Sequence, residues 1–397
     1  MSKPANCPVS ELDPFALDFL ENPYPFHHDL REAGPVVWLE KYNIFAMARY
    51  QQVRTALTDW EVFCSSRGVG LSDFAKEAPW RPPSIILEAD PPKHTRARNV
   101  LVNVLSKTAL QRLSTNFKDT ADKLIDSLVE KHEIDAIQDL AEAFPLSVFP
   151  DAIGLRKDGR ENLLPYGNMA FNAFGPRNEL FQQSFANAQP VVQWISDQCQ
   201  RQALAPDGIG EQIYKSADSG AITAEEAGLL VRSLLTAGLD TTIFGIGAML
   251  YCFASYAEQW EVLRSNPALV RGAFEEAIRF ISPVQTFMRT TTRAVEVEGI
   301  EIPEGQKVVL FLASANRDPR QWEHPDRFDI SRRTLGHVGF GSGIHVCVGQ
   351  MLARLEAHIL LQSLIEKVER IELTGEPKWR LNNTLHGLDR LPVRLSA

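Results

Sequence analysis

The stretch from Thr223 to Tyr256 constrains the fold of this chain more than any other. It contains no proline and is largely apolar on both faces of a helix, which predicts one long, buried helix. The capping box Thr223–Glu226 marks its start. At 1.5 Å per residue, such a helix would run roughly 50 Å, long enough to cross a whole domain. The rest of the chain must pack around it.

Residues 237–242, which read Ala-Gly-Leu-Asp-Thr-Thr, are a poor sequence for the interior of that helix. Glycine costs about 1 kcal/mol relative to alanine there, and Asp240 and Thr241 compete for backbone hydrogen bonds. One interpretation is a packing glycine followed by a threonine that bonds the carbonyl one turn back. The other is a functional site, because proteins break local rules mainly where function requires it.

Residues 340–349 form a glycine-rich loop that carries Cys347 to the start of an apolar-periodic helix. The apolar positions that follow share one helical face, which comprises Val348, Met351, Leu352, Leu355 and Ile359. A helix N-terminus favours a thiolate, and Gly341 and Gly343 leave room for a large, flat group against the backbone. A thiolate presented in this way suits a haem iron. The alternative is a buried structural cysteine.

Composition excludes several classes of function. The 397 residues are 44% apolar, ample for a core, and their net charge of −9 argues against a nucleic acid or an anionic membrane as a partner. The cysteines are few, scattered and without a CxxC pair, which argues against disulfides and structural zinc; they are Cys7, Cys64, Cys199, Cys252 and Cys347. Residues 1–18 lack an apolar signal segment, so we expect a cytoplasmic protein with no membrane anchor.

The remaining pattern predicts a single domain over residues 1–397, mainly α with small β-sheets. In the first part of the chain we expect a short helix at Pro25–Ala33 and a hairpin formed by Val36–Leu39 and Asn43–Ala48. A second helix follows at Tyr50–Thr58, and then a long proline-rich loop over 60–93. Further helices are predicted over 94–106, 107–131, 137–154 and, with interruptions at Pro165 and Gly175-Pro176, 159–202. Residues 203–220 are expected to be a polar connector.

The C-terminal part is predicted to hold a helix from Asn266-Pro267 to Ser282, short strands within 294–312, a helix from Cys347 to about Arg370, and terminal strands. Glu276 and Arg279 lie three residues apart on one helical face. An exposed pair of this kind contributes only a few tenths of a kcal/mol. The alternative is a buried pair joined by a second arginine.

Four separated motifs together resemble the soluble bacterial cytochromes P450 over essentially the full length of the chain. They are the cysteine loop 340–349, Asp240-Thr241 after Ala237-Gly238, Glu276-x-x-Arg279 with Arg327 in His-Pro-Asp-Arg-Phe, and His94-Thr-Arg-Ala-Arg98. The resemblance implies the single-domain cytochrome P450 fold, with a long central helix, a haem-thiolate loop and substrate lids at about 60–93 and 159–202.

The resemblance also implies a cofactor and the residues that hold it. The iron of haem b would be ligated by Cys347, and its propionates would be held by His94, Arg98, Arg289 and His345. O2 would be the co-substrate, and Asp240 with Thr241 would deliver protons into an otherwise dry pocket. Glu276, Arg279 and Arg327 would form a structural cluster.

Electrons would come from a [2Fe–2S] ferredoxin and its NAD(P)H-dependent reductase, because no such domain is present in the chain. The ferredoxin would dock near the cysteine loop. Arg332, Arg333 and Arg354 are candidate contacts for it, or else are solvated surface arginines.

Within the family, the chain is similar to the branch that oxidises para-substituted benzoic acids such as 4-methoxybenzoate. That similarity implies a polar end around the substrate carboxylate and a slot of phenylalanines for the ring, formed by Arg81, Ser84, Arg232, Ser233, Thr236, Phe171, Phe174 and Phe287. The expected reaction is hydroxylation or oxidative O-demethylation by a monooxygenase. The alternatives are a terpenoid or fatty-acid substrate, a peroxide-driven haem-thiolate enzyme, a haem-free interaction protein, and core packing for the phenylalanines.

Overall fold

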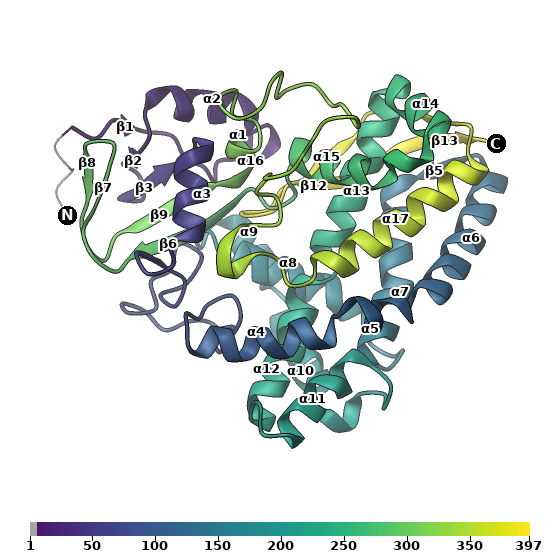
Figure 1. Cartoon of the computed structure of the whole chain (residues 1–397), viewed down its shortest axis with the longest axis horizontal. Helices are drawn as coiled ribbons and strands as arrows, with labels where there is room; N and C mark the ends of the chain where they lie inside the picture. The colour runs from purple at the N-terminus through teal and green to yellow at the C-terminus, as the bar shows by residue number, and fades with distance from the viewer. Residues whose placement is uncertain (1–5) are drawn as a thin grey trace.

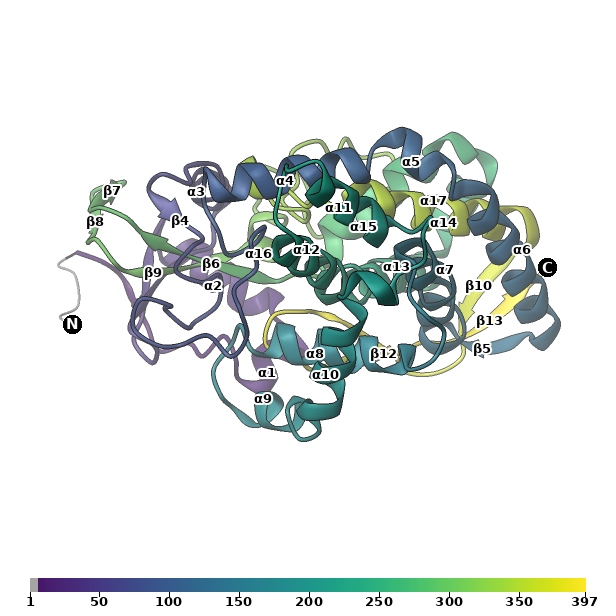
Figure 2. The same cartoon turned by 90° about the horizontal axis from the view of Figure 1, so that it is seen from below.

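The computed structural model describes residues 6–397, which form a sheet-rich side and a larger helical side around a central pair of helices (Figure 1). The N-terminal strands lie at one end of the molecule, and the C-terminus lies at the other. Viewed from below, the central α12 (Ala224–Ala237) and α13 (Asp240–Ser255) pass between α17 (Gln350–Lys367) on one side and α8 (Leu163–Asn172), α10 (Ala188–Gln198) and β12 (Gly387–Arg390) on the other (Figure 2). The chain is mainly α with small sheets, as predicted.

The main sheet has six strands in the order β1-β2-β3-β9-β6-β4. Their bounds are Val9–Ser10, Val37–Leu39, Ile44–Met47, Lys307–Phe311, Thr286–Thr291 and Phe63–Cys64. The predicted hairpin is confirmed, since Val37 pairs with Ala46 in antiparallel register. Segments far apart in sequence meet where β3 pairs with β9 in parallel. Through β6 the sheet delivers Phe287 and Arg289 to the neighbourhood of Cys347.

The helices of the N-terminal half are α1 to α7, whose bounds are Leu17–Glu21, Tyr24–Ala33, Tyr50–Thr58, Lys93–Val104, Lys107–Gln111, Ser114–Lys131 and Ala143–Ile153, with a π-helix over Ala136–Glu142. The expected helices at 25–33 and 50–58 are confirmed. The single helix predicted over 107–131 is wrong, because residues 112–113 separate α5 from α6. Apart from the short β4, residues 60–92 have neither helix nor strand, as predicted for 60–93.

The central stretch is two helices, α12 (Ala224–Ala237) and α13 (Asp240–Ser255), rather than the one uninterrupted helix predicted. The capping box at Thr223 is confirmed. The helix breaks at Gly238-Leu239, where a Cβ on Gly238 would lie 2.5 Å from the ring of Phe149. Only glycine permits this contact, and the interruption falls within the poor helix sequence.

Residues 224–255 are long and apolar enough to cross a membrane by length and composition. In this fold, however, 67% of their most apolar window is buried inside the protein. The helix pair packs against α15 (Val270–Ile281), α8 and the π-helix. Its apolar character is therefore that of a core helix.

The next segments contain α8 to α11, at Leu163–Asn172, Glu179–Ser184, Ala188–Gln198 and Ile209–Asp218. The interruption at Gly175-Pro176 is confirmed, whereas Pro165 lies within the first turn of α8. The polar connector predicted over 203–220 is wrong. That stretch forms α11, whose buried face includes Ile209, Ile213 and Tyr214 and packs on α12.

The C-terminal elements are α14 to α17 and strands β7, β8 and β10 to β13, together with β5. The helices span Ala257–Ser265, Val270–Ile281, Leu312–Ala315 and Gln350–Lys367. The strands span Val295–Val297, Ile300–Ile302, Arg370–Leu373, Lys378–Arg380, Gly387–Arg390, Pro392–Ser396 and Glu133–Asp135. The strands predicted within 294–312 and at the C-terminus are confirmed. Met351 was expected on the apolar face but is 48% exposed.

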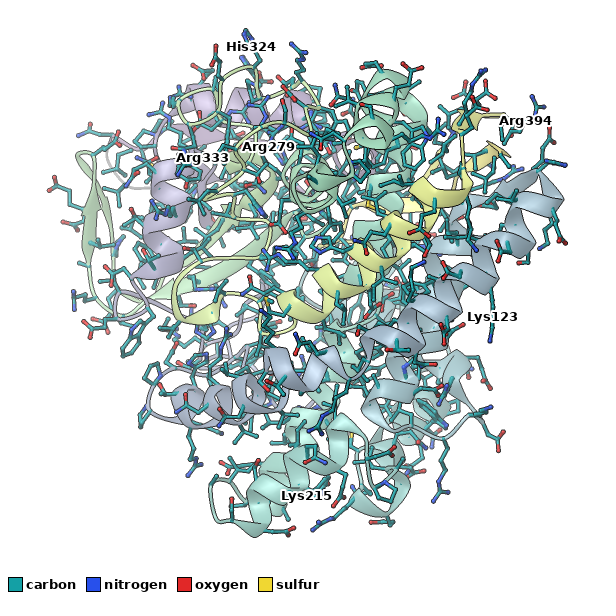
Figure 3. All side chains as sticks on the ribbon, turned by 45° about the vertical axis from the view of Figure 1, so that its right-hand side comes forward. Lys123, Lys215, Arg279, His324, Arg333 and Arg394 are labelled. Atoms are coloured by element: carbon teal, nitrogen blue, oxygen red, sulfur yellow. The ribbon has the colours of Figure 1, made fainter. Side chains whose placement is uncertain are left out.

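Glu276 and Arg279 form a fully buried pair joined by a second arginine, but that arginine is not Arg327. Arg332 Nε lies 3.1 Å from Glu276 Oε1, while Arg327 contributes only its backbone carbonyl. The side chain of Arg327 is exposed. In Figure 3, Arg279 lies inside the molecule and His324 projects from its edge. The cluster ties α15 to the loop that precedes the cysteine stretch.

Arg332→Ala is expected to lower the free energy of unfolding by roughly 2–4 kcal/mol, because it leaves a buried carboxylate with half of its charge compensation. Arg327→Ala is the matched control, and we expect it to stay within about 0.5 kcal/mol of the parent. Chemical denaturation of both variants tests this. A larger loss for Arg327→Ala would contradict the assignment.

Candidate active site

An apolar cavity opens between the central helix pair, α4, α15 and the cysteine loop, and Cys347 lies in its wall. The helix of the cysteine loop begins at Gln350, three residues after Cys347 and not at it. The backbone of the loop is set by glycine. At Gly343, where φ is +69°, a Cβ would lie 2.7 Å from the carbonyl oxygen of Leu57. No other residue lets the loop pass this close to α3.

Opposing effects act on the pKa of the Cys347 thiol. Burial raises its pKa, while backbone N–H groups of Gly349 and Gln350 and the cation of Arg98 act in the opposite direction. The Cys347 N–H donates to the carbonyl of Phe340 at 2.8 Å, which closes the loop. A Cβ on Gly349 would reach within 3.9 Å of the sulfur. A half-buried sulfur in the wall of an apolar cavity suits a bound metal ion as its charge partner.

The four predicted propionate-binding residues come together at one side of this cavity. The rings of His94 and His345 lie 4.4 Å apart, and both ring nitrogens of His94 are buried without a hydrogen-bond partner among residues 6–397. Arg98 donates to the carbonyl of Val346 at 2.5 Å. Arg289 is 3% exposed and donates to the carbonyl of Met288, with Asp90 its principal neighbouring anion.

The basic side chains of this cluster lack a sufficient anionic partner among the described residues. Burial, together with the neighbouring His345 and Arg98, lowers the pKa of His94 to about 4, and burial lowers the pKa of Arg289 to about 10. The imidazole of His345 lies 3.8 Å from Asp90, longer than a hydrogen bond. Two carboxylates of a flat, apolar macrocycle would pair with these donors, and Cys347 in the same cavity would be available to its metal ion. The residues present therefore fit haem.

Asp240 and Thr241 are adjacent but face different surroundings. Thr241 lines the cavity, and its hydroxyl donates to the carbonyl of Ala237 at 2.7 Å. Asp240 is 3% exposed and packs on α8, where a Cβ on Gly167 would lie 1.6 Å from its Oδ2. That oxygen has no hydrogen-bond partner in the described part of the chain. Burial raises the pKa of Asp240 to about 7, against the opposing influence of Arg380.

Seven of the eight predicted substrate residues line the same cavity as Cys347; they are Arg81, Ser84, Phe171, Phe174, Ser233, Thr236 and Phe287. The aromatic rings make a continuous edge-to-face row, with Phe174 centred 5.9 Å from both Phe171 and Phe287. Arg232 does not line this cavity. It faces a neighbouring hollow bounded by α10, α11 and α12, and donates to the carbonyl of Pro82.

The polar end of the cavity is already hydrogen-bonded within the protein. The hydroxyls of Ser84 and Ser233 lie 3.0 Å apart, and Arg81 Nη1 lies 3.2 Å from Glu88 Oε2. The guanidinium of Arg81 also covers the ring of Trp80 at 5.5 Å. Its Nε is buried and has no hydrogen-bond partner within the residues that the structure describes.

The sequence interpretation missed several of these residues. Thr242 also lines the cavity and donates to the carbonyl of Gly238. Glu88 and Gly167 had no periodic or motif signal, since their roles come from contacts across the fold. Phe244, three residues past Thr241, is buried against Gly387 beneath Arg380 and does not line the cavity.

The three arginines expected to contact a ferredoxin differ in the structure. Arg332 belongs to the Glu276 cluster. Arg354 pairs with Glu275 at 2.6 Å, and that carboxylate also meets His337 at 2.9 Å. Arg333 is exposed. Of the three, Arg333 is the one whose side chain is exposed at the surface and could contact a partner protein.

The chain belongs to the cytochrome P450 family. The family model for cytochrome P450 matches residues 178–388. The chain is 58% identical over 393 residues to cytochrome P450 CYP199A2 of Rhodopseudomonas palustris, a match that covers 99% of this chain and 95% of the relative. It is 30% identical over 395 residues to beta-dihydromenaquinone-9 omega-hydroxylase of Mycobacterium tuberculosis, covering 98% and 79%.

Solved structures agree with this assignment. Cytochrome P450 CREJ in complex with (4-ethylphenyl) dihydrogen phosphate superposes with a TM-score of 0.88 at 25% identity, covering 97% of this chain and 99% of that one. The protein is a cytochrome P450 monooxygenase, and its cofactor and co-substrate are haem b and O2. A redox partner and a small-molecule substrate follow from the family.

Proposed function

We propose that this monooxygenase hydroxylates or oxidatively O-demethylates a small para-substituted aromatic acid such as 4-methoxybenzoate. The observation that carries the proposal is the arrangement of one cavity. It has Arg81, Ser84 and Ser233 at one end, a row of phenylalanines along its side, and Cys347 in its wall. A benzoate needs donors at one end and a flat apolar slot for its ring.

Such an arrangement makes regioselectivity a matter of geometry. If the donors hold the carboxylate, the opposite end of the ring is the part free to approach the haem. The CREJ complex supports this proposal, because a related fold there holds a para-substituted aryl anion. Phe171, Phe174 and Phe287 would exclude water from the ring. Arg232 would act on the carboxylate indirectly, through the carbonyl of Pro82 beside Arg81.

The remaining roles concern the cofactor and its protons. Cys347 would ligate haem iron, and His94, Arg98, Arg289 and His345 would hold the propionates. When bound, haem supplies the activation of O2 and the transfer of one oxygen atom to substrate. Thr241 would present its hydroxyl within the cavity. Asp240, with a pKa of about 7, can hold or release a proton near neutral pH behind Thr241.

Electrons would come from a [2Fe–2S] ferredoxin and its NAD(P)H-dependent reductase in the cytoplasm, with Arg333 among the surface contacts. Residues 60–93 and 159–202 would cover the substrate. Both ranges contribute to the cavity wall, which supports this role: the first supplies Arg81 and Ser84, and the second supplies Phe171 and Phe174.

Spectral titration of the ferric enzyme tests the substrate class. We expect 4-methoxybenzoate to shift the haem from low to high spin, and its methyl ester to bind at least about tenfold more weakly, since the ester cannot accept a charge-assisted bond. Arg81→Ala and Arg232→Ala should each weaken acid binding, with the larger loss for Arg81→Ala. Esters that bind as well as acids would contradict the proposal.

A long apolar substrate is the second candidate, supported by the omega-hydroxylase relative and the apolar cavity wall. It predicts the opposite order in the same titration. Fatty acids or isoprenoid alcohols would then shift the spectrum at lower concentration than benzoates. Turnover with peroxide alone that exceeds turnover with a ferredoxin would instead indicate a peroxide-driven enzyme.

A further inference from the structure

A buried carboxylate stands behind the donors at the polar end of the cavity. Glu88 and Arg81 have side chains only 4% and 8% exposed, and their charged atoms lie 3.2 Å apart. The same Glu88 Oε2 accepts the backbone N–H of Ser84 at 2.7 Å. Glu88 does not line the cavity, whereas Arg81 and Ser84 do. It therefore holds two of the ligand-facing residues from behind.

Positive charges outnumber negative charges around Glu88 and Arg81. The two cations are Arg81 and Arg232. Both act electrostatically on Tyr166, and burial together with the charge of Arg81 lowers the pKa of Arg232. Glu88 is the anion that acts on Arg232 in the opposite direction. Two guanidinium groups and one carboxylate leave a single positive charge. Arg232 is half-buried and faces the neighbouring hollow, so this charge acts on the cavity from behind Pro82 and favours a ligand that brings one negative charge.

We propose that Glu88 is a specificity-determining residue whose carboxylate neutralises one of the two arginines, so that the cavity selects aromatic ligands with one negative charge. This inference rests on the proposed function, in which an acid binds at this end. A monocarboxylate brings the local charge to zero. A neutral ester leaves one positive charge uncompensated, and a doubly charged ligand leaves one negative charge in excess.

Glu88→Gln tests the inference, because glutamine keeps the volume and an oxygen for the Ser84 N–H but removes the charge. The probes are 4-methoxybenzoate, its methyl ester and 4-ethylphenyl phosphate at pH 8, titrated into the ferric haem-loaded enzyme. We expect the Kd of the benzoate to fall about tenfold, that of the ester to stay within about twofold, and the phosphate dianion to gain more than the benzoate.

Two further variants make the outcome decisive. Glu88→Asp keeps the charge and should keep the acid-to-ester ratio of the parent. Asp122→Asn removes a carboxylate from a distant pair with Lys118 on α6 and should not change that ratio. If Glu88→Gln leaves the ratio of the acid Kd to the ester Kd unchanged, the role of Glu88 is overturned. A parent enzyme that binds esters as well as acids overturns the proposed function instead.

Discussion

Cys347→Ala is expected to abolish the red-shifted absorption band of the ferrous carbon monoxide complex and to reduce product formation to background. The band requires a thiolate on the iron, and Cys347 is the cysteine in the wall of the cavity. The fold should persist, since helices α13, α15 and α17 pack without involving this side chain. Carbon monoxide difference spectra and far-ultraviolet circular dichroism measure the two properties separately.

Cys252→Ala is the matched control, because Cys252 is fully buried in α13 and does not line the cavity. It should keep the band and lose only about 1 kcal/mol of stability to the small void. A Cys347→Ala protein with an unchanged band would contradict the assignment, as would loss of the band in Cys252→Ala alone.

Asp240→Asn is expected to stabilise the protein at alkaline pH while lowering product formation by roughly 100-fold. Burial raises the pKa of Asp240 from 3.8 to about 7, so the folded state holds this proton more tightly than the unfolded chain. The free energy of unfolding contributed by this group therefore falls as the pH rises from about 4 to about 7. Asparagine cannot ionise and does not contribute this decline.

The stability gain of Asp240→Asn over the parent should grow from near zero at pH 4 to roughly 4 kcal/mol at pH 8. Denaturant titrations of parent and variant in parallel cancel all other titrating groups. Asp389→Asn is the control, because that carboxylate is 54% exposed and pairs with Arg380. A variant less stable than its parent at pH 8 would show that Asp240 is paired in its charged form.

Features that depend on local chemistry could be predicted from the sequence. The capping box at Thr223 contains its own hydrogen-bonding partners within one turn, and the hairpin from residue 37 to 47 follows from alternation and a short turn. The family resemblance worked for a similar reason. A cysteine loop held by Gly343 against α3 permits few substitutions, so its sequence is distinctive.

Features that depend on contacts across the fold could not be predicted. Arg332 replaces Arg327 in the Glu276 cluster because the loop turns the first side chain inward and the second outward. The polar stretch 203–220 forms α11 because its one apolar face finds a partner on α12. Spacing along the chain does not specify either outcome.

The sequence by itself determined the class of protein, the cysteine loop and the position of the unusual residues in the central helix. Only the tertiary structure decided how those residues face, with Thr241 toward the cavity and Asp240 toward Gly167, and which carboxylate stands behind Arg81. The physical reason is the separation along the chain between the residues that interact. Capping, turns and periodicity act over a few residues, whereas burial, charge pairing and ligand geometry arise between residues that only the folded chain brings together.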